Sequence, residues 1–573
     1  MNGPVVDGPV IDETEVRGPV GVVGAGTMGA GIAQVAAVAG RRVLIADAVP
    51  GAAERAVAAV RDRVKAQVAK GRLSVDPDAL DLTAVESVAG LAGCAVVVEA
   101  VVEDLAVKRA LFAELEAVVA ADAILASNTS SLSPTALAAG LTSPRRLVGL
   151  HFFNPVPAMR LVEVISGLAT APEVADAAAG LAAEWGKTVV RSTATPGFIV
   201  NRIARPYYAE AWRLYEEHAA VPQHIDAVLT GGGGFRMGPF ALMDLIGHDV
   251  NEAVTRSVWT AFGYDPRFAP SLAQRALVEA GWLGRKSGRG IYPAEGAPAA
   301  APAPPVPPPP AVTEHAAPAV THHAPPAVTG HAPSAGTGHA PPAVTGHAPS
   351  AGTGHAPPAV THHAPPTPAG RASSPLRALL ERSGVAIVPG DRDDTAAGRP
   401  GGIVELPSGA LLAACEGVTA TALSAAFERP VIVADRVLDP ATATAIAVAV
   451  SDGCPPVAVA EAVGLLQAAG LDVYLIDDTP GLIVTRTVAM LANLAADALA
   501  CQVATEPDID RAMRLGVNYP LGPLAWARQW GIGTVLRILD SLDDWYRDGR
   551  YRPSPLLRRT ALSHRTAVQA RQS

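Results

Sequence analysis

The first half of the chain shows two successive patterns of apolar residues. Between residues 18 and 193, short β-branched runs such as GPVGVVG, RRVLIAD and AVVVEAV are separated by alanine-rich stretches typical of helices. Strands that alternate with helices indicate a parallel sheet with helices on its faces. Residues 194–293 contain successive helical stretches that break at GGGGFRMGP and GRKSGRG. We therefore expect an α/β domain at 18–193 and an all-α domain at 194–293.

The same two patterns return after a long interruption. Residues 375–476 again mix apolar runs, such as RPVIVAD and LDVYLID, with helical stretches, and residues 477–545 are again helical. Between the halves, residues 294–374 contain APAPPVPPPP and histidine-led octads such as HAPPAVTG, which predict a disordered, semi-extended linker without a packed core. An N-terminal tail at 1–17 and a C-terminal tail at 546–573 complete the expected organisation.

A short phrase indicates that the second half repeats the first. TPGFIVNR at Thr195–Arg202 reappears 284 residues later as TPGLIVTR at Thr479–Arg486, with Asn201 replaced by Thr485. Residues 375–476 contain no GxGxxG, HFFNP or NTSS sequence, so we expect a degenerate second repeat that cannot run the same reaction. The same offset relates further positions: Ile225 and Asp226 to Ile509 and Asp510, Gly238 and Pro239 to Gly522 and Pro523, and Gly247 to Gly531.

The composition favours a soluble, cytoplasmic protein. Its 573 residues are enough for several domains, and 45 Lys and Arg against 54 Asp and Glu leave a net charge of −9 with no basic tract, which argues against nucleic acid as a partner. No uncharged apolar run reaches the roughly 18 residues of a membrane span, and the acidic N-terminus is unlike a signal peptide. The cysteines lack CxxC spacing and are expected to be reduced thiols: Cys94, Cys415, Cys454 and Cys501.

The regular histidines of the linker raise the question of a metal site. They recur every eight residues from His315 to His363. In a polyproline helix, eight residues span roughly 25 Å, which is too far for successive histidines to share one metal ion. A repeat that expanded and is tolerated in a linker is the simpler interpretation. We therefore expect no metal site.

A glycine-rich loop near the N-terminus predicts a dinucleotide site. GVVGAGTMGAGIAQ places Gly24, Gly26 and Gly29 in GxGxxG spacing, directly after a strand and at the start of a helix. This arrangement suits a tight turn, close approach of a pyrophosphate and close packing of helix on strand. Asp47 ends the next strand, where a carboxylate binds the ribose hydroxyls of NAD and repels the extra phosphate of NADP. A glycine turn that only packs is the alternative; the expected NAD contacts in the loop also include Ala25, Thr27 and Met28.

Three later segments carry groups suited to alcohol oxidation: SNTSS, HFFNPVP and LVEVI. Transfer of a hydride from a secondary alcohol to NAD requires a base for the hydroxyl proton and donors for the developing oxyanion. His151 ends a strand at the carboxyl edge of the expected sheet, which makes it the natural base. Glu163, on the next extended run, is placed to return beside it and fix its tautomer. A histidine that serves only in packing is the alternative.

Together with the glycine loop and TPGFIVNR, these segments resemble the L-3-hydroxyacyl-CoA dehydrogenase family over residues 18–293. The resemblance implies that His151 and Glu163 are the catalytic pair. It further implies that Ser130 and Asn201 bind the reacting oxygen, whereas a helix cap and a helix-surface amide are their alternative roles. The tandem arrangement resembles the long two-repeat subgroup, which includes 3-hydroxybutyryl-CoA and 3-hydroxyadipyl-CoA dehydrogenases.

The resemblance also implies contacts to both substrates. For CoA it implies Lys70 and Arg72, although a solvated basic turn is an equally good interpretation of AKGRL. The family's helical domains mediate dimerisation, so we expect a homodimer or a pseudo-dimer formed by the two helical domains. The positions that match cofactor-lining residues of the family are Glu103, Lys108, Asn154 and Lys286.

We therefore expect NAD-dependent oxidation of (S)-3-hydroxyacyl-CoA to 3-oxoacyl-CoA, in fatty-acid β-oxidation or in butanoate or phenylacetate-type catabolism. Two alternatives stay open: a dehydrogenase of free hydroxy acids, such as L-gulonate, on the same fold, and a non-catalytic NAD-binding scaffold. The sequence leaves the acyl chain open. A dicarboxyl substrate would need a cation near the pocket, and Arg202, Arg205 and Arg236 are available without one being singled out.

Overall fold

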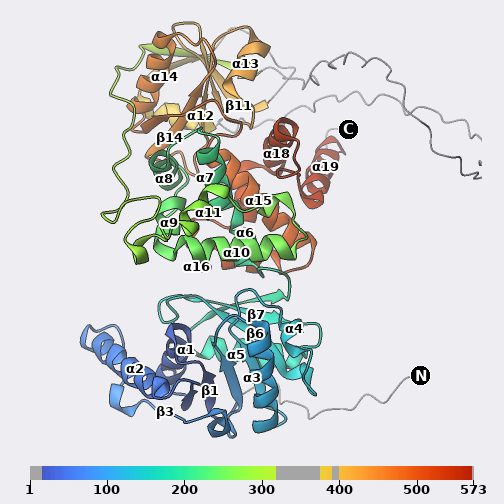
Figure 1. Ribbon diagram of the computed structural model, residues 1–573. Helices are drawn as coiled ribbons and strands as arrows, with labels where there is room; N and C mark the ends of the chain where they lie inside the picture. Colours follow the sequence, from blue (N-terminus) through green and yellow to red (C-terminus); the bar gives the residue numbers. More distant parts are fainter. Residues whose placement is uncertain (1–15, 318–374, 390–398, 571–573) are drawn as a thin grey trace, which may run out of the picture.

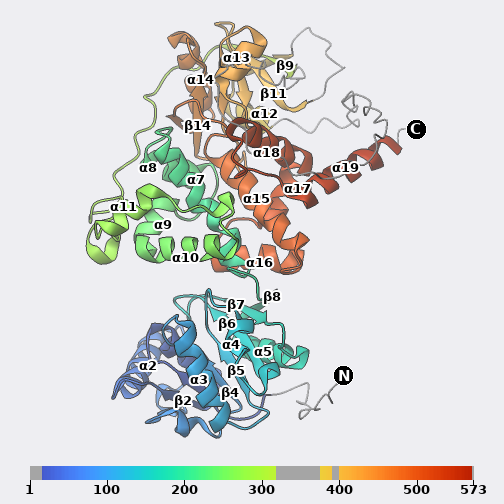
Figure 2. The same ribbon diagram turned by 45° about the vertical axis from the view of Figure 1, so that its right-hand side comes forward.

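The computed structural model describes residues 16–317, 375–389 and 399–570. Figures 1 and 2 show the first α/β domain, in blue to cyan, at one end of the molecule and the second α/β domain, in yellow to orange, at the other. The helices of both repeats lie between them. None of the helices in these ranges is long and apolar enough to cross a membrane.

The first α/β domain is built on an eight-stranded sheet in the order β3-β2-β1-β4-β5-β6-β7-β8. Neighbouring strands are parallel except for β6 and β7, which run antiparallel. Apolar clusters cover both faces, which explains why the strands are continuous apolar runs. The strands are β1 (Val20–Val23), β2 (Val43–Ala46), β3 (Leu82–Ala84), β4 (Val96–Glu99), β5 (Ile124–Ser127), β6 (Leu147–Phe152), β7 (Leu161–Ser166) and β8 (Thr188–Thr193).

The helices of this domain connect successive strands over the two faces of the sheet. They are α1 (Thr27–Val38), α2 (Ala52–Ala69), α3 (Leu105–Val118), α4 (Pro134–Ala138) and α5 (Pro172–Glu184), with 3-10 turns η1 (Pro77–Ala79), η2 (Val88–Leu91) and η3 (Pro144–Arg146). The helical domain that follows contains α6 (Val200–Ile203), α7 (Arg205–Glu216), α8 (Pro222–Gly231), α9 (Pro239–Ile246), α10 (His248–Ala261) and α11 (Leu272–Glu279), with η4 (Pro266–Phe268) and η5 (Arg285–Ser287).

The second α/β domain has a seven-stranded mixed sheet in the order β10-β9-β11-β12-β13-β14-β15. Its strands are β9 (Ala311–Ala317), β10 (Ala386–Pro389), β11 (Arg399–Glu405), β12 (Leu411–Ala414), β13 (Val431–Ala434), β14 (Ala445–Val450) and β15 (Asp472–Leu475). Its helices are α12 (Pro375–Leu380), η6 (Glu381–Ser383), α13 (Ala420–Phe427) and α14 (Pro456–Ala468). The second helical domain contains α15 (Val484–Ala500), α16 (Glu506–Gly516), α17 (Pro523–Trp530), α18 (Ile532–Tyr546) and α19 (Pro555–Ala570).

The duplication extends further toward the N-terminus than the repeated phrase. β14 and α14 start and end 284 residues after β7 and α5. The pairing register is also kept, because Val433 pairs with Ala449 as Gly149 pairs with Ile165. On the other side of β12, the second sheet continues into β11, β9 and β10 instead of strands ordered like β4 to β1. The second repeat therefore preserves the part of the sheet from β5 to β8 and, in the residues described, lacks the glycine-loop half.

Two expected boundaries are wrong. Residues 311–317 of the expected linker form β9, which pairs with β10 and β11 and buries Val312. The extended stretch before β9 packs along the second α/β domain, where the Ala303 amide donates to the Val473 carbonyl (2.7 Å). Proline-rich backbone is already extended, and its few non-proline amides and valines suffice for this docking. Residues 318–374, which contain most of the octads, lie outside the described residues.

The expected C-terminal tail is also ordered in large part. α19 packs against α15 and α18 and buries Leu557, while Tyr551 in the preceding turn is fully buried. The sequence of α19 spaces Leu557 and Ala561 four residues apart, so both lie on one helix face. That short apolar face is easily overlooked in a stretch rich in arginine.

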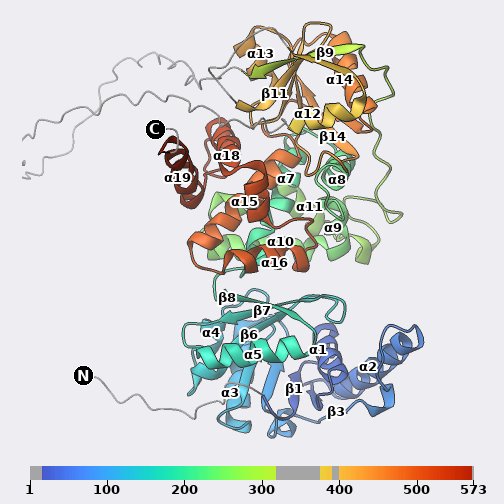
Figure 3. The same cartoon turned by 180° about the vertical axis from the view of Figure 1, so that it is seen from behind.

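The two repeats pack reciprocally about an approximate two-fold relation. The Thr193 amide donates to the Val503 carbonyl (2.9 Å), and the Asp477 amide donates to the Ala219 carbonyl (2.9 Å). Asp477 lies 284 positions after Thr193, and Ala219 lies 284 positions before Val503, so the two bonds are equivalent with the repeats exchanged. Figure 3 shows α16 of the second repeat beside β7 and β8 of the first, and α8 makes the corresponding contact with β14. A single apolar core joins both helical domains.

Candidate active site

The antiparallel pair β6 and β7 explains the spacing of the predicted catalytic pair. His151 and Glu163 are directly opposite each other in the strand register. Nδ1 of His151 lies 2.6 Å from Oε2 of Glu163, and both side chains are buried. The carboxylate therefore holds the Nδ1–H tautomer, which leaves Nε2 as a proton acceptor. The structure brings this predicted pair together.

The second oxygen of Glu163 joins the sheet to the helical domain. Its Oε1 accepts hydrogen bonds from the backbone amides of Ile199 (3.0 Å) and Val200 (3.1 Å). These residues begin α6, which carries Asn201. One buried carboxylate therefore orients both the histidine and the first turn of the helix that presents the predicted oxygen-binding amide.

Asn201 and Ser130 also meet. Nδ2 of Asn201 donates to the backbone carbonyl of Ser130 (3.2 Å), which leaves its second amide hydrogen available for another acceptor. The N-cap of α4 is Ser133 and not Ser130, so the helix-cap alternative for Ser130 is wrong. The rings of Phe153 and Phe198 lie 4.4 and 5.9 Å from that of His151 and shield it from water.

Glu103 organises the serine loop that follows β5. Its Oε1 accepts hydrogen bonds from the backbone amides of Ser130 (2.9 Å) and Ser131 (3.0 Å) and from the hydroxyl of Thr129 (2.7 Å). Burial would raise the pKa of Glu103, but the nearby charge of Lys108 and these hydrogen bonds outweigh it and lower the pKa to about 2. The carboxylate is therefore ionised at neutral pH and fixes the loop.

Sequence reasoning missed Glu99, which supports the serine loop through Ser127 at the end of β5. Glu99 is fully buried and accepts from Lys108 Nζ (2.5 Å) and from the hydroxyl of Ser127 (2.7 Å). Lys108 also lies 3.0 Å from Glu103 and so connects the two carboxylates. The signal was visible in the sequence as a charged residue that ends the apolar run AVVVE.

The glycine loop has the shape that a dinucleotide requires. Gly24 has φ +101°, and a Cβ at this position would lie 2.6 Å from the carbonyl oxygen of Ala100. A Cβ at Gly29 would lie 1.8 Å from the carbonyl oxygen of Gly24. A Cβ at Gly26 would meet nothing within 4 Å, so the loop is open beside Gly26, which is the N-cap of α1. Asp47 accepts the Ala25 amide through Oδ2 (2.6 Å). Thr27 and Met28 form the first turn of α1. These residues fit NAD.

The four other predicted contacts lie in three different places. Asn154 follows β6 and lines a cavity of about 340 Å³ together with Thr27 and Arg63. Lys286 belongs to the helical domain and is paired with Asp249 (2.6 Å), and the structure does not bring it into contact with the glycine loop. At the end of α2, Lys70 and Arg72 are exposed.

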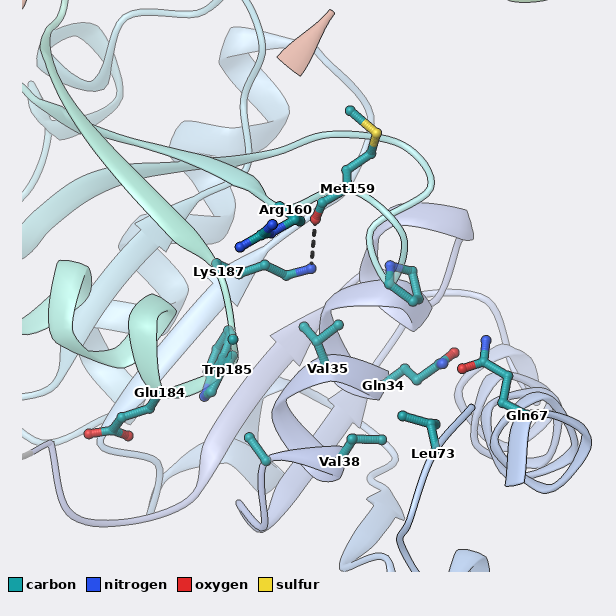
Figure 4. A pocket seen from close by; sticks show the side chains of 13 residues that line it. Gln34, Val35, Val38, Gln67, Leu73, Met159, Arg160, Glu184, Trp185 and Lys187 are labelled. Carbon is teal, nitrogen blue, oxygen red and sulfur yellow. Dashed lines mark hydrogen bonds between the residues drawn. The ribbon is translucent and has the colours of Figure 1, made fainter. Parts of the chain in front are cut away.

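A second cavity of similar volume lies away from the catalytic pair, between α1, α2 and the end of α5 (Figure 4). Lys187 points across it and donates to the carbonyls of Val156 (2.6 Å) and Met159 (2.9 Å). Burial lowers the pKa of Lys187 to about 8. Because its donors are turned to backbone carbonyls, the lysine stabilises the loop after β6 that carries Asn154.

The second repeat has different residues at the equivalent catalytic positions. At 284 residues from His151 and Glu163 stand Asp435 and Ala447. Oδ2 of Asp435 accepts the amides of Ile483 (2.9 Å) and Val484 (2.7 Å), and its Oδ1 accepts the hydroxyl of Thr485 (2.7 Å). Burial raises the pKa of Asp435 against the effect of these hydrogen bonds. The position holds the start of α15 but offers no imidazole base.

Comparison with known proteins agrees with this geometry. The family model for the NAD-binding domain of 3-hydroxyacyl-CoA dehydrogenase matches residues 19–195. The model for the C-terminal domain of that enzyme matches residues 197–294 and again 481–572. The model for the reduced Rossmann-fold domain of 3-hydroxybutyryl-CoA dehydrogenase matches residues 412–480. The chain belongs to the 3-hydroxyacyl-CoA dehydrogenase family.

Three relatives place the chain within this family. It is 41% identical over 546 residues to 3-hydroxyadipyl-CoA dehydrogenase of Escherichia coli K12, covering 95% of this chain and 97% of the relative. A crystal structure of 3-hydroxybutyryl-CoA dehydrogenase from Escherichia coli K12 matches with a TM-score of 0.77 and 40% identity over 95% of this chain and 98% of that one. A probable 3-hydroxybutyryl-CoA dehydrogenase of Bacillus subtilis is 40% identical over 47% of this chain and 95% of its own length.

These findings confirm the predicted family, fold class and cofactor. The protein is an oxidoreductase that carries out NAD-dependent oxidation of 3-hydroxyacyl-CoA. NAD, when bound, supplies the hydride acceptor for this reaction.

Proposed function

We propose that His151 is the general base of this dehydrogenase. Its Nε2 takes the proton of the C3 hydroxyl, while Glu163 keeps the proton on Nδ1 and stabilises the imidazolium that forms. Ser130 and the free amide hydrogen of Asn201 hold the oxygen as it becomes a carbonyl. The observation that carries this proposal is the 2.6 Å contact of Glu163 with His151, made by the same carboxylate that binds the start of α6.

Two further features support the assignment of the cofactor residues. The open face at Gly26 and the carboxylate of Asp47 suit the pyrophosphate and the ribose of NAD, respectively. Glu103 and Lys108 act by fixing the serine loop, and Asn154 lines the cavity next to Thr27. Lys286 reaches the cofactor in this proposal only if its pair with Asp249 opens. We assign Lys70 and Arg72 to the phosphates of CoA because both are exposed cations beyond α2.

The test of the function measures NADH absorbance with acetoacetyl-CoA and with free acetoacetate. The proposal expects rapid NADH oxidation with the thioester and at least tenfold lower kcat/KM with the free acid. Comparable rates with the free acid would instead favour a dehydrogenase of free hydroxy acids. NAD binding without turnover of either compound would favour a scaffold.

A dicarboxylic acyl chain is a second, more specific candidate substrate. The relative that matches 95% of this chain is named for 3-hydroxyadipyl-CoA. Of the three available arginines, Arg205 is buried, donates through Nε to the Asn201 carbonyl (2.8 Å) and lines a cavity of about 80 Å³. Its other polar contact is the Thr255 hydroxyl (3.0 Å), so its charge is not matched by an acidic side chain within the described residues.

We propose that Arg205 receives the distal carboxylate of such a substrate. The test is the ratio of kcat/KM for 3-hydroxyadipyl-CoA to that for 3-hydroxybutyryl-CoA, in the native protein and in Arg205→Met. A ratio makes the test insensitive to the fraction of folded enzyme. The proposal expects the ratio to fall at least tenfold in the variant, whereas an unchanged ratio would contradict it.

We further infer that the second repeat serves as a dimer partner within the chain. The reciprocal bonds of Thr193 with Val503 and of Asp477 with Ala219, and the shared apolar core, support this inference. A cytoplasmic location, without nucleic acid or membrane as a partner, is part of the same proposal and agrees with the four free thiols. Light scattering on the purified full-length chain would show whether pseudo-dimers associate further.

A further inference from the structure

Two buried arginines occupy equivalent positions in the repeats. Arg202 and Arg486 both end the repeated phrase and are 4% and 0% exposed. Nη1 of Arg486 lies 3.6 Å from Oε2 of Glu217, which comes from the other repeat. Arg486 also donates through Nη2 to the hydroxyls of Thr479 (3.0 Å) and Tyr546 (2.9 Å). The charge of Arg486 is therefore matched across the approximate two-fold relation, although Nη1 itself makes no hydrogen bond within the described residues.

The surroundings of Arg202 lack these partners. The residues at the equivalent positions of Glu217 and Tyr546 are Cys501 and Phe262, and the Phe262 ring lies 4.9 Å from the guanidinium carbon. Nε of Arg202 and the hydroxyl of Thr195 are buried without hydrogen-bond partners in the part of the chain that the structure describes. Cys501 acts electrostatically on the guanidinium of Arg202.

The carboxylate that acts on Arg202 does not compensate for this difference. Asp497 contributes electrostatically to Arg202, but it forms an ion pair with Arg267. Burial lowers the pKa of Arg202, although Cys501 and Asp497 partly oppose the effect. The site thus has a buried cation and two unpartnered polar atoms at the place where the other repeat has a carboxylate.

Cys501 is accessible to small reagents. It is the exposed cysteine of the chain, whereas Cys94 and Cys415 are buried and Cys454 is half-buried. We propose that Cys501 is an oxidation site at which a hydroperoxide converts the thiol to a sulfinate, which then pairs with Arg202 as Glu217 pairs with Arg486. A sulfinate carries two oxygens and one negative charge, as a carboxylate does, so it supplies the acceptors that Arg202 and Thr195 lack.

The reaction needs two equivalents of hydrogen peroxide as oxidant. The thiol first loses its proton to solvent. The thiolate sulfur then attacks one peroxide oxygen, the S–O bond forms as the O–O bond breaks, and the departing hydroxide takes a proton from solvent to become water. Sulfur loses two electrons and peroxide gains them, which gives the sulfenic acid. A second peroxide repeats the step and gives the sulfinic acid, whose proton is lost to solvent. The new anion would join α6, which carries Asn201, to the residue that follows α15.

The first experiment treats the full-length protein with increasing hydrogen peroxide and follows each cysteine by peptide mass spectrometry. The proposal expects the Cys501 peptide to gain two oxygen atoms before the Cys454 peptide gains any, and the melting temperature to rise as it does so. Cys501 that stays reduced, or that is oxidised no earlier than Cys454, would overturn the proposal. A melting temperature that falls with oxidation at Cys501 would also overturn it.

A matched pair of variants tests the charge without oxidation. Cys501→Glu places a carboxylate opposite Arg202, and Cys501→Gln places a neutral side chain of the same shape there. We expect the Glu variant to melt higher than the Gln variant by about 2–4 °C, the shift that a modest stabilisation gives in domains of this size. Equal melting temperatures, or a lower one for the Glu variant, would show that Arg202 does not need an anion.

Discussion

Asp435 of the second repeat accepts the same pair of backbone amides that Glu163 accepts in the first. Glu163 reaches the amides of Ile199 and Val200 from β7, whereas Asp435 reaches those of Ile483 and Val484 from the position equivalent to His151. Each repeat therefore keeps a buried carboxylate at the start of the first helix of its helical domain. Only in the first repeat is a histidine left beside that carboxylate.

This relationship predicts different effects of two matched substitutions. Glu163→Gln removes the charge that supports the imidazolium, so kcat should fall by about 10²- to 10⁴-fold. Asp435→Asn replaces one accepting oxygen with an NH₂ group that faces donors at the start of α15, so the hydrogen bonds to that oxygen are lost. The substitution should lower the unfolding free energy by about 1–3 kcal/mol. Its turnover per folded enzyme should stay within about twofold. Steady-state kinetics and denaturant unfolding of both variants check the prediction, and a large loss of kcat in Asp435→Asn would contradict it.

The single-letter difference between the repeated phrases predicts a second matched pair. Asn201→Thr removes an amide that can hold the reacting oxygen, so kcat should fall by about 10²-fold. Thr485→Asn breaks a hydrogen bond to Asp435 in a site without a base and should leave kcat nearly unchanged. The NADH assay under saturating substrate distinguishes them. Equal losses in the two variants would mean that the second repeat also acts in turnover.

The glycine loop predicts which glycine serves the ligand and which serves the fold. At Gly29 an added Cβ would meet the Gly24 carbonyl at 1.8 Å, so Gly29→Ala should lower the melting temperature. At Gly26 an added Cβ meets nothing, so Gly26→Ala should leave the melting temperature unchanged and raise KM for NAD at least tenfold. An unchanged KM in a stable Gly26→Ala protein would place the pyrophosphate elsewhere.

Asp226 predicts a dependence of stability on pH. It accepts the amides of Phe240 and Ala241 and the Tyr292 hydroxyl, yet burial outweighs these bonds and raises its pKa to about 6. The folded protein thus holds this proton more tightly than the unfolded chain does. The resulting stabilisation is complete below about pH 4 and is lost as the pH rises to about 6.

The measurement is the unfolding free energy of the native protein minus that of Asp226→Asn across this pH range. The difference should fall by about 2–3 kcal/mol between pH 4 and pH 6. Asp510 accepts the equivalent hydrogen bonds from the amides of Leu524 and Ala525. The same difference in unfolding free energy, measured with Asp510→Asn, is therefore the matched comparison in the second repeat. A difference that rises with pH would mean that the hydrogen bonds outweigh the burial.

Much of the site followed from local sequence patterns. The glycine spacing, the strand that ends just before Asp47 and the His151–Glu163 spacing each belong to a single rigid element or strand pair, so the sequence predicts them well. The role of Asp435 could not be predicted, because it depends on which residues face each other across an antiparallel pair. The docking of β9 and α19 was missed for a similar reason: a short apolar face has meaning only once the surface that covers it is known.

The most direct test of the central claim is the His151→Gln variant, which removes the base and keeps a similar volume. Turnover of 3-hydroxybutyryl-CoA and calorimetric NAD binding are measured on the same preparation. If His151 is the base, kcat falls by about 10²-fold or more while the dissociation constant of NAD stays within about twofold. Near-normal turnover with intact NAD binding would contradict the assignment of His151 and, with it, the mechanism proposed for this site.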